Sequence, residues 1–246
     1  MRIGWTRLSF PYPYPLVVEV CFYGIFAGSL YASLQRFGRR VTELLLIGAI
    51  LWSTFIENFI VLNGGYDYYG YARGTFPGYM AWVGVVPLWI VLGWFSMTSL
   101  SYILTDTLLP GKSPYLRSLF AALISLNIDL LLDPVAVSTG LWRWTHPSVY
   151  ILGVPLTNWV GWFAIVYFFV LAFETVVIQN SPVKDPFPAR GGIAWRRILT
   201  PFLKRLLLLA PVVLLGTLAV MMLLALYTNV PGPYRNIFPA PFGWWS

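Results

Sequence analysis

The stretch from Asn127 to Trp159 reads NIDLLLDPVAVSTGLWRWTHPSVYILGVPLTNW and joins two apolar runs through a polar loop rich in tryptophan. It begins as the end of an apolar helix that carries Asp129 and Asp133, and Pro134 predicts that the helix ends there. The loop also contains His146, the only histidine of the chain. Carboxyl groups and indoles at one mouth of a hydrophobic bundle indicate a site for chemistry on an apolar molecule.

The composition around this stretch is that of a membrane protein. Of the 246 residues, 58% are hydrophobic and 10% are charged, whereas a soluble domain has about 25% charged residues. A membrane-spanning helix needs about 20 apolar residues. We therefore expect an all-α integral membrane bundle that forms a single polytopic domain over residues 1–246. The six predicted spans are residues 16–34, 41–62, 79–104, 116–132, 156–178 and 202–227.

The basic residues predict the orientation of this bundle. The net charge is +7, but the basic residues lie between apolar runs, which indicates contacts with lipid headgroups and no binding of nucleic acid. The positive-inside rule then places both termini and the loop that contains Arg143 on the outer side of the cell inner (cytoplasmic) membrane. Most Lys and Arg residues fall in the other connections: Arg36, Arg39, Arg40, Lys112, Arg117, Lys184, Arg190, Arg196, Arg197, Lys204 and Arg205.

Several kinds of site lack support in the sequence. Cys21 is the only cysteine and His146 has no companion at a ligand spacing, so we expect no metal site. No GxGxxG, GxxxxGK[ST] or GxSxG motif is present, so neither a nucleotide nor an esterase site is predicted, and we expect no cofactor. No repeat of 20–50 residues is visible.

The orientation brings four polar groups to one depth near the outer surface. Glu57 lies near the end of the second span, Asp129 and Asp133 share one face of the fourth span, and Asn158 begins the fifth. A charged, unpaired carboxyl group inside a bilayer costs about 2.5–3.5 kcal/mol at a helix centre. Each carboxyl group could simply hold helices together, and for any one of them this is as good an explanation as catalysis. For the set, convergence favours a site, because apolar surroundings favour the protonated form that a general acid requires.

A longer pattern of residues resembles a known family, the carotenoid biosynthesis membrane proteins. This family includes the carotenoid 1',2'-hydratase of bacteria and the bisanhydrobacterioruberin hydratase of halophilic archaea. The resemblance runs from about Ser53 to Trp162. It rests on these residues: Glu57-Asn58, a Gly/Tyr loop, Trp82, Val86-Pro87, Trp89, Asp133-Pro134, Gly140-Leu141-Trp142-x-Trp144 and Gly153-Val154-Pro155-x-x-Asn158-Trp159-x-Gly161-Trp162.

The resemblance implies a cofactor-independent hydratase of the hydro-lyase class, acting on a lycopene-like or γ-carotene-like polyene. Water would add across the terminal isopropylidene double bond and give a tertiary alcohol. Asp133 or Glu57 would donate the proton and the other would orient the water, with Asp129 as a third catalytic candidate. The substrate-binding candidates are Trp142, Trp144, Asn158, Tyr66, Asn58 and Trp82.

Three other functions stay open at this point. The chain could be a non-catalytic subunit that binds a carotenoid or lipid within a membrane complex. It could be a carotenoid end-group cyclase, which begins with the same protonation but captures the cation internally. A transporter is a further alternative, against which the lack of repeats counts.

Overall fold

The fold is a bundle of long apolar helices with a few short strands. The computed structural model describes residues 14–68, 81–144, 149–180 and 192–228. Its helices are α1 (Tyr14–Leu62), α2 (Leu88–Leu108), α3 (Pro114–Ser138), α4 (Leu156–Ala172), the π-helical turn η1 (Phe173–Ile178) and α5 (Gly192–Thr228). Within the described ranges, five helical segments are long and apolar enough to cross a membrane, so the chain is a multi-pass helical membrane protein.

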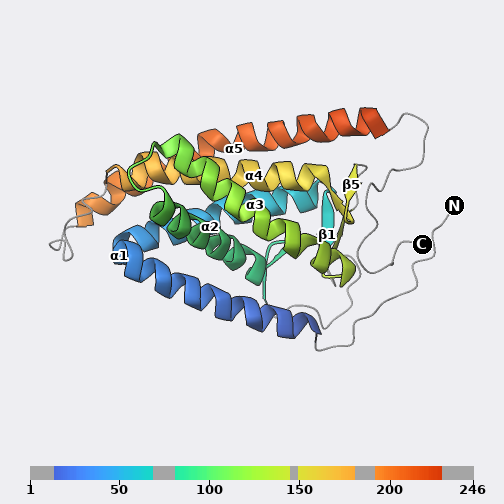
Figure 1. Cartoon of the computed structure of the whole chain (residues 1–246), viewed down its shortest axis with the longest axis horizontal. Helices are drawn as coiled ribbons and strands as arrows, with labels where there is room; N and C mark the ends of the chain where they lie inside the picture. The colour runs from blue at the N-terminus through green and yellow to red at the C-terminus, as the bar shows by residue number, and fades with distance from the viewer. Residues whose placement is uncertain (1–13, 69–80, 145–148, 181–191, 229–246) are drawn as a thin grey trace.

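Helix α1 contains two of the predicted spans. It is assigned as a single helix of 49 residues, but Gly38 has φ 74° and ψ 170° and interrupts it. The chain reverses there, so that α1 has two limbs (Figure 1). Both Phe22 of the first limb and Glu57 of the second reach the start of α2, through Trp89 and Trp94 respectively. The predicted count of six separate helices is therefore not confirmed, because the first two predicted spans are the two limbs of α1.

Two prolines behave differently from the prediction. The third span was expected to begin at residue 79 and to be interrupted by Pro87, but α2 begins directly after Pro87, which is its N-cap. Pro134 was expected to end a helix, but α3 continues through it to Ser138. A proline is tolerated in a membrane helix where neighbouring groups satisfy the backbone. The expected bounds of the fifth span, 156–178, match α4 and η1 together.

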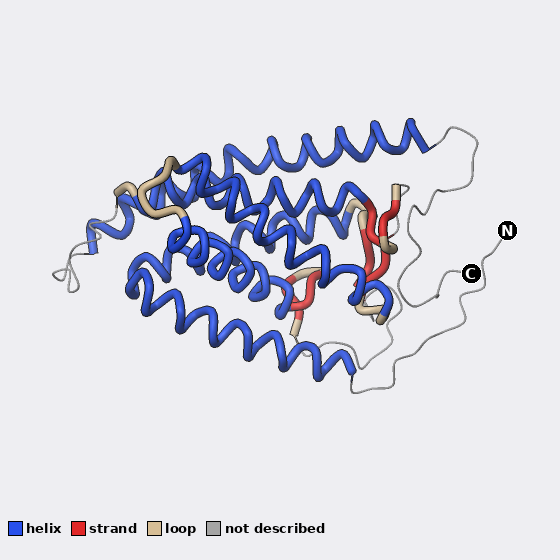
Figure 2. Tube along the Cα trace, viewed as in Figure 1, coloured by secondary structure: helices blue, strands red, loops and turns tan. Residues whose placement is uncertain are grey.

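Short strands, which were not predicted, lie toward one end of the helices (Figure 2). Strand β1 (Tyr66–Tyr68) pairs with β4 (Trp142–Trp144) in an antiparallel ribbon. The strands β2 (Trp82–Val83) and β3 (Val86–Pro87) form a tight hairpin before α2. The strands β5 (Tyr150–Ile151) and β6 (Val154–Pro155) form a similar hairpin before α4.

The order of these elements is an internal repeat. The second limb of α1, β1, the β2–β3 hairpin and α2 follow one another as α3, β4, the β5–β6 hairpin and α4 do. Residues 86–95 read VPLWIVLGWF and residues 154–163 read VPLTNWVGWF, with six of ten positions identical. The two copies are about 70 residues apart, a longer period than the 20–50 residues considered above. The prediction of no repeat was therefore wrong at this longer period, and a lack of repeats no longer counts against a transporter.

Candidate functional site

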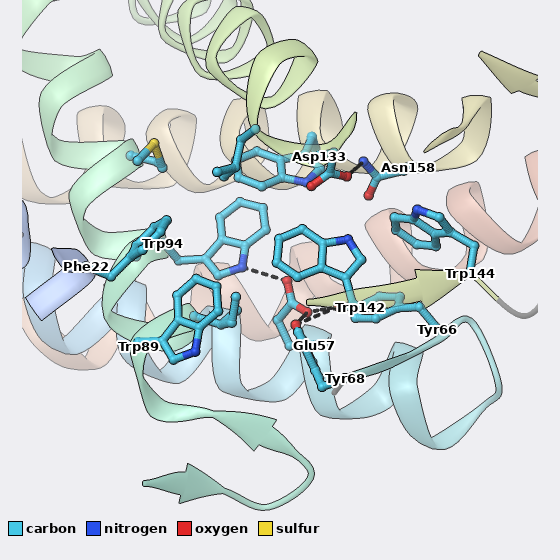
Figure 3. A pocket seen from close by; sticks show the side chains of 15 residues that line it. Phe22, Glu57, Tyr66, Tyr68, Trp89, Trp94, Asp133, Trp142, Trp144 and Asn158 are labelled. Atoms are coloured by element: carbon cyan, nitrogen blue, oxygen red, sulfur yellow. Dashed lines mark hydrogen bonds between the residues drawn. The ribbon is translucent and has the colours of Figure 1, made fainter. Parts of the chain in front are cut away.

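One pocket lies at the end of the bundle where the strands gather. Its wall comes from both limbs of α1, from α2, α3 and α4, and from the β1–β4 ribbon. The free space is about 50 Å³, several times the roughly 10–15 Å³ that one water molecule requires. In Figure 3, Glu57 and Tyr68 lie on one side of the pocket, Asp133 and Asn158 lie on the other, and indole rings lie between them.

Glu57 has hydrogen-bond donors at both carboxylate oxygens. The Trp94 indole nitrogen donates to its Oε1 at 2.6 Å. The Tyr66 hydroxyl donates to its Oε2, and the Tyr68 hydroxyl donates to the same atom at 3.1 Å. The side chain is buried, with 6% of its surface exposed. These donors hold the carboxyl group in a fixed orientation at the pocket wall.

The opposite side of the pocket has two carboxyl groups and one amide. Asp129 and Asp133 lie one turn apart on α3 and are both buried. The Asn158 amide, on the first turn of α4, donates to Asp129 Oδ2 at 3.1 Å and also to Asp133 Oδ2. Asp133 and Asn158 line the pocket, whereas Asp129 lies behind them. Asn158 thus ties the start of α4 to the acidic face of α3.

The β1–β4 ribbon supplies four aromatic rings to the pocket because side chains alternate along a strand. Its inward residues line the pocket, and they are Tyr66, Tyr68, Trp142 and Trp144. Its outward residues are Asp67 and Arg143, which are register partners and form an ion pair at 2.8 Å. Both strands of the ribbon therefore present aromatic rings toward the pocket and a charged side chain away from it.

Two of the predicted substrate-binding residues lie outside the pocket wall. Asn58 donates to the Thr54 carbonyl oxygen at 2.8 Å and to the Val83 carbonyl oxygen at 3.1 Å, and it accepts from the Val85 amide at 2.8 Å. Asn58 thus fastens the β2–β3 hairpin to α1. Trp82 is half-buried in β2 and does not line the pocket. Both were predicted to bind substrate, and for both this stays a prediction.

The internal repeat pairs the pocket residues of one half with those of the other. Gly64 follows Glu57 by seven positions and Gly140 follows Asp133 by seven, and both glycines have positive φ. The two acids are therefore equivalent in the repeat, and the pocket lies between the halves. The equivalent pairs that line it are Glu57 and Asp133, Tyr66 and Trp142, Tyr68 and Trp144, Ile90 and Asn158, and Trp94 and Trp162.

Sequence reasoning missed several residues of this site. Tyr68, Trp89 and Trp94 were not among the predicted site residues, and tryptophan and tyrosine are common at membrane interfaces. The repeat would have been a signal for Trp94, since it occupies the position of Trp162 in the identical Gly-Trp-Phe triplet.

Two further questions concern metal ions and the lone histidine. His146 lies outside the described residues. No group of three or more His, Cys, Asp or Glu side chains that could hold a metal ion occurs in the parts of the chain that the structure describes. The described part of the site consists of carboxyl, amide, phenol and indole groups among apolar side chains.

Fold and pocket together define a multi-pass helical membrane protein with buried acids in an aromatic pocket. The family described as carotenoid biosynthesis protein matches residues 16–231, and the chain belongs to this family. It is 32% identical over 125 residues to the bisanhydrobacterioruberin hydratase of Haloarcula japonica, which covers 50% of this chain and 41% of that protein. The match thus spans less than half of the relative's length. No solved structure matches the chain.

These comparisons support a role in carotenoid biosynthesis.

Proposed function

We propose that this protein hydrates the terminal isopropylidene double bond of an acyclic carotenoid end group, giving a tertiary alcohol. The observation that carries the proposal is the position of Glu57 and Asp133, which come from different helices and face one buried, aromatic-lined pocket. The name of the relative, a hydratase of a carotenoid, supports the same reaction. We further propose that the protein acts in the cytoplasmic membrane with this pocket toward the outer side.

The chemistry requires an acid, a base and a water molecule. A carboxylic acid protonates the less substituted carbon of the double bond, which breaks the π bond and leaves a tertiary cation. Water then forms a bond to the cationic carbon and gives its extra proton to a carboxylate. Glu57 and Asp133 supply one group of each kind, and the reaction consumes neither a redox equivalent nor a further reactant.

The aromatic rings suit the intermediate. A cation over an aromatic face is stabilised by about 2 kcal/mol or more when it is desolvated. Trp94, Trp142 and Trp162 all line the pocket. The rings also keep bulk water away from the cation, while the pocket has room for the few water molecules that hydration needs.

Pigment analysis tests this proposal. The gene would be expressed in a strain that makes lycopene and in one that makes γ-carotene, with Glu57→Gln and Asp133→Asn as the comparison variants. The proposal predicts a new pigment that is heavier than its precursor by one water molecule and that is lost in both variants. A cyclised product of unchanged mass would support the cyclase instead. Pigment that copurifies unchanged would support the non-catalytic carotenoid-binding subunit.

A further inference from the structure

The two acids of the pocket occupy equivalent positions of the internal repeat but have different neighbours. Beside Asp133 lie a second carboxyl group, Asp129, and the amide of Asn158. The positions equivalent to these are Ser53 and Ile90 in the half that contains Glu57. Conversely, the two tyrosines that donate to Glu57 correspond to tryptophans in the other half. The two halves of the repeat therefore place similar acids in the pocket but surround them with chemically different side chains.

The hydrogen-bond donors around Glu57 favour its ionised form. An indole N–H can only donate a hydrogen bond, so Oε1, which accepts from Trp94 at 2.6 Å, does not carry a proton. The hydroxyl groups of Tyr66 and Tyr68 donate to Oε2. Hydrogen bonds to the charged form of a carboxyl group stabilise that form. Glu57 is thus equipped as a carboxylate that can accept a proton.

The surroundings of Asp133 favour a bound proton. Asp129 and Asp133 are both buried, and the same Asn158 amide donates to Oδ2 of each, so the two carboxyl groups lie side by side. Two adjacent carboxylates in a buried site disfavour double ionisation. Among the described residues, the Asn158 amide is the N–H donor that the pair shares. Of the two acids, Asp133 is the one that lines the pocket.

We infer that Asp133 is the proton donor and Glu57 is the base that activates water, an assignment that rests on the proposed function. The acids lie on opposite sides of the pocket (Figure 3), so the proton and the water reach the double bond from opposite sides. The proton of Asp133 forms the new C–H bond, and the proton lost by water passes to Glu57. Exchange with solvent then resets both groups. Asp129, Tyr66, Tyr68 and Trp94 act as positioning residues.

Deuterium exchange separates the two roles. Membranes that contain the full-length protein and its carotenoid would be incubated in deuterated water, and both the hydrated product and the recovered carotenoid would be analysed by mass spectrometry. In Glu57→Gln, Asp133 still protonates the alkene, but the cation lacks a base for water. It returns to an alkene when the protonated carbon or a neighbouring methyl group gives a proton back to the Asp133 carboxylate. Deuterium therefore enters the recovered carotenoid, while hydration falls at least about 100-fold.

The Asp133→Asn variant should behave differently. Without the acid no cation forms, so both hydration and exchange fall at least about 100-fold. Asp129→Asn should lower hydration and exchange together, because Asp133 loses the partner that keeps it protonated. The matched control is Ser53→Ala, at the position equivalent to Asp129. The Ser53 hydroxyl donates a hydrogen bond to the Ile50 carbonyl oxygen of its own helix. Changing Ser53 to alanine should therefore alter neither hydration nor deuterium exchange.

Each outcome decides the assignment. Exchange that persists in Asp133→Asn and is lost in Glu57→Gln would reverse the two roles. Equal behaviour of the two variants would show that the roles are not divided. If the unchanged protein makes no hydrated product from either precursor, the proposed function itself fails, and the assignment with it. The amount and thermal stability of each variant in the membrane would be measured. Trp94→Phe gives a second test that leaves Glu57 in place, because it removes a donor that favours the ionised form of Glu57.

Discussion

Trp94 and Trp162 stack with their ring centroids 4.2 Å apart and an interplanar angle of 26°. Each lies seven positions after the proline that precedes its helix, Pro87 or Pro155, so the two rings are equivalent in the internal repeat. The halves of the protein therefore meet ring to ring at the pocket. Trp94 donates a hydrogen bond to Glu57, an acid of the pocket, which makes the contact between the two rings asymmetric in function.

The Trp94→Phe change tests the bond to Glu57. The phenyl ring keeps an aromatic contact with Trp162 but removes the N–H donor. A hydrogen bond to a charged group contributes about 1.5–3 kcal/mol, so we expect kcat/KM for hydration to fall roughly ten- to hundredfold. In the Glu57→Gln background, the same change should lower the residual rate by less than about twofold, since the bonded carboxylate is already absent. An equal loss in both backgrounds would contradict the bond's role.

The Gly84→Ala change tests the support of the β2–β3 hairpin. Gly84 has φ +65°, and a Cβ there would overlap Oδ1 of Asn58, which holds the hairpin to α1. Gly111 is the matched control, because it has φ +70° but open space around its Cβ position. Gly111→Ala should cost about 1–2 kcal/mol of stability from backbone strain alone, and Gly84→Ala should cost more. Thermal unfolding in detergent would measure both, and equal effects would contradict the close packing at Asn58.

The Arg117→Ala change tests a polar network at the other end of the bundle. Arg117 is buried, pairs with Glu174 at 2.9 Å and also pairs with Asp106. The Tyr102 hydroxyl donates to Glu174 at 2.5 Å. Removing one partner of a buried ion pair typically costs about 3–5 kcal/mol. Arg36 also pairs with Asp106, but from a half-exposed position. Changing Arg36 to alanine should therefore lower the stability by less than about 1 kcal/mol.

Those two arginine variants would be compared by thermal unfolding in detergent. A loss at Arg36 as large as the loss at Arg117 would contradict the larger contribution expected of the buried network.

The orientation in the membrane remains a prediction from the basic residues, and thiol labelling tests it. The only cysteine, Cys21, is exposed and would first be changed to serine. Single cysteines would then replace Arg143, at the pocket end, and Lys112, at the other end; both side chains are exposed. A membrane-impermeant reagent should label position 143 on cells with a permeable outer envelope, and position 112 only after the membrane is opened. The reverse pattern would contradict the predicted orientation.

The sequence predicted the helical membrane bundle because long apolar runs leave little alternative in a bilayer. It also predicted the meeting of Glu57 with Asp133, since both stand at helix ends on the same side. The predictions made from the two prolines were wrong. Pro87 precedes α2 as its N-cap and does not interrupt it, and Pro134 lies within α3 and does not end it. Whether a proline interrupts a membrane helix depends on neighbouring groups that the local sequence does not reveal.

The repeat and the role of Trp94 were beyond the sequence interpretation for a related reason. The halves share short identical segments, but the connections between the strand and the hairpin differ in length, so no single offset aligns them. Trp94 is one of 12 tryptophans, and only its contact with a carboxyl group 37 positions away distinguishes it from a residue of the membrane interface.

The most direct test of hydration by the acid pair is the source of the new oxygen atom. Cells that make lycopene and this protein would be grown in water enriched in heavy oxygen, and the hydroxylated carotenoid would be analysed by mass spectrometry. Our account predicts that the hydroxyl oxygen comes from water, and that no such product forms with Asp133→Asn. A hydroxyl oxygen that comes from molecular oxygen, or a product that persists in this variant, would contradict it.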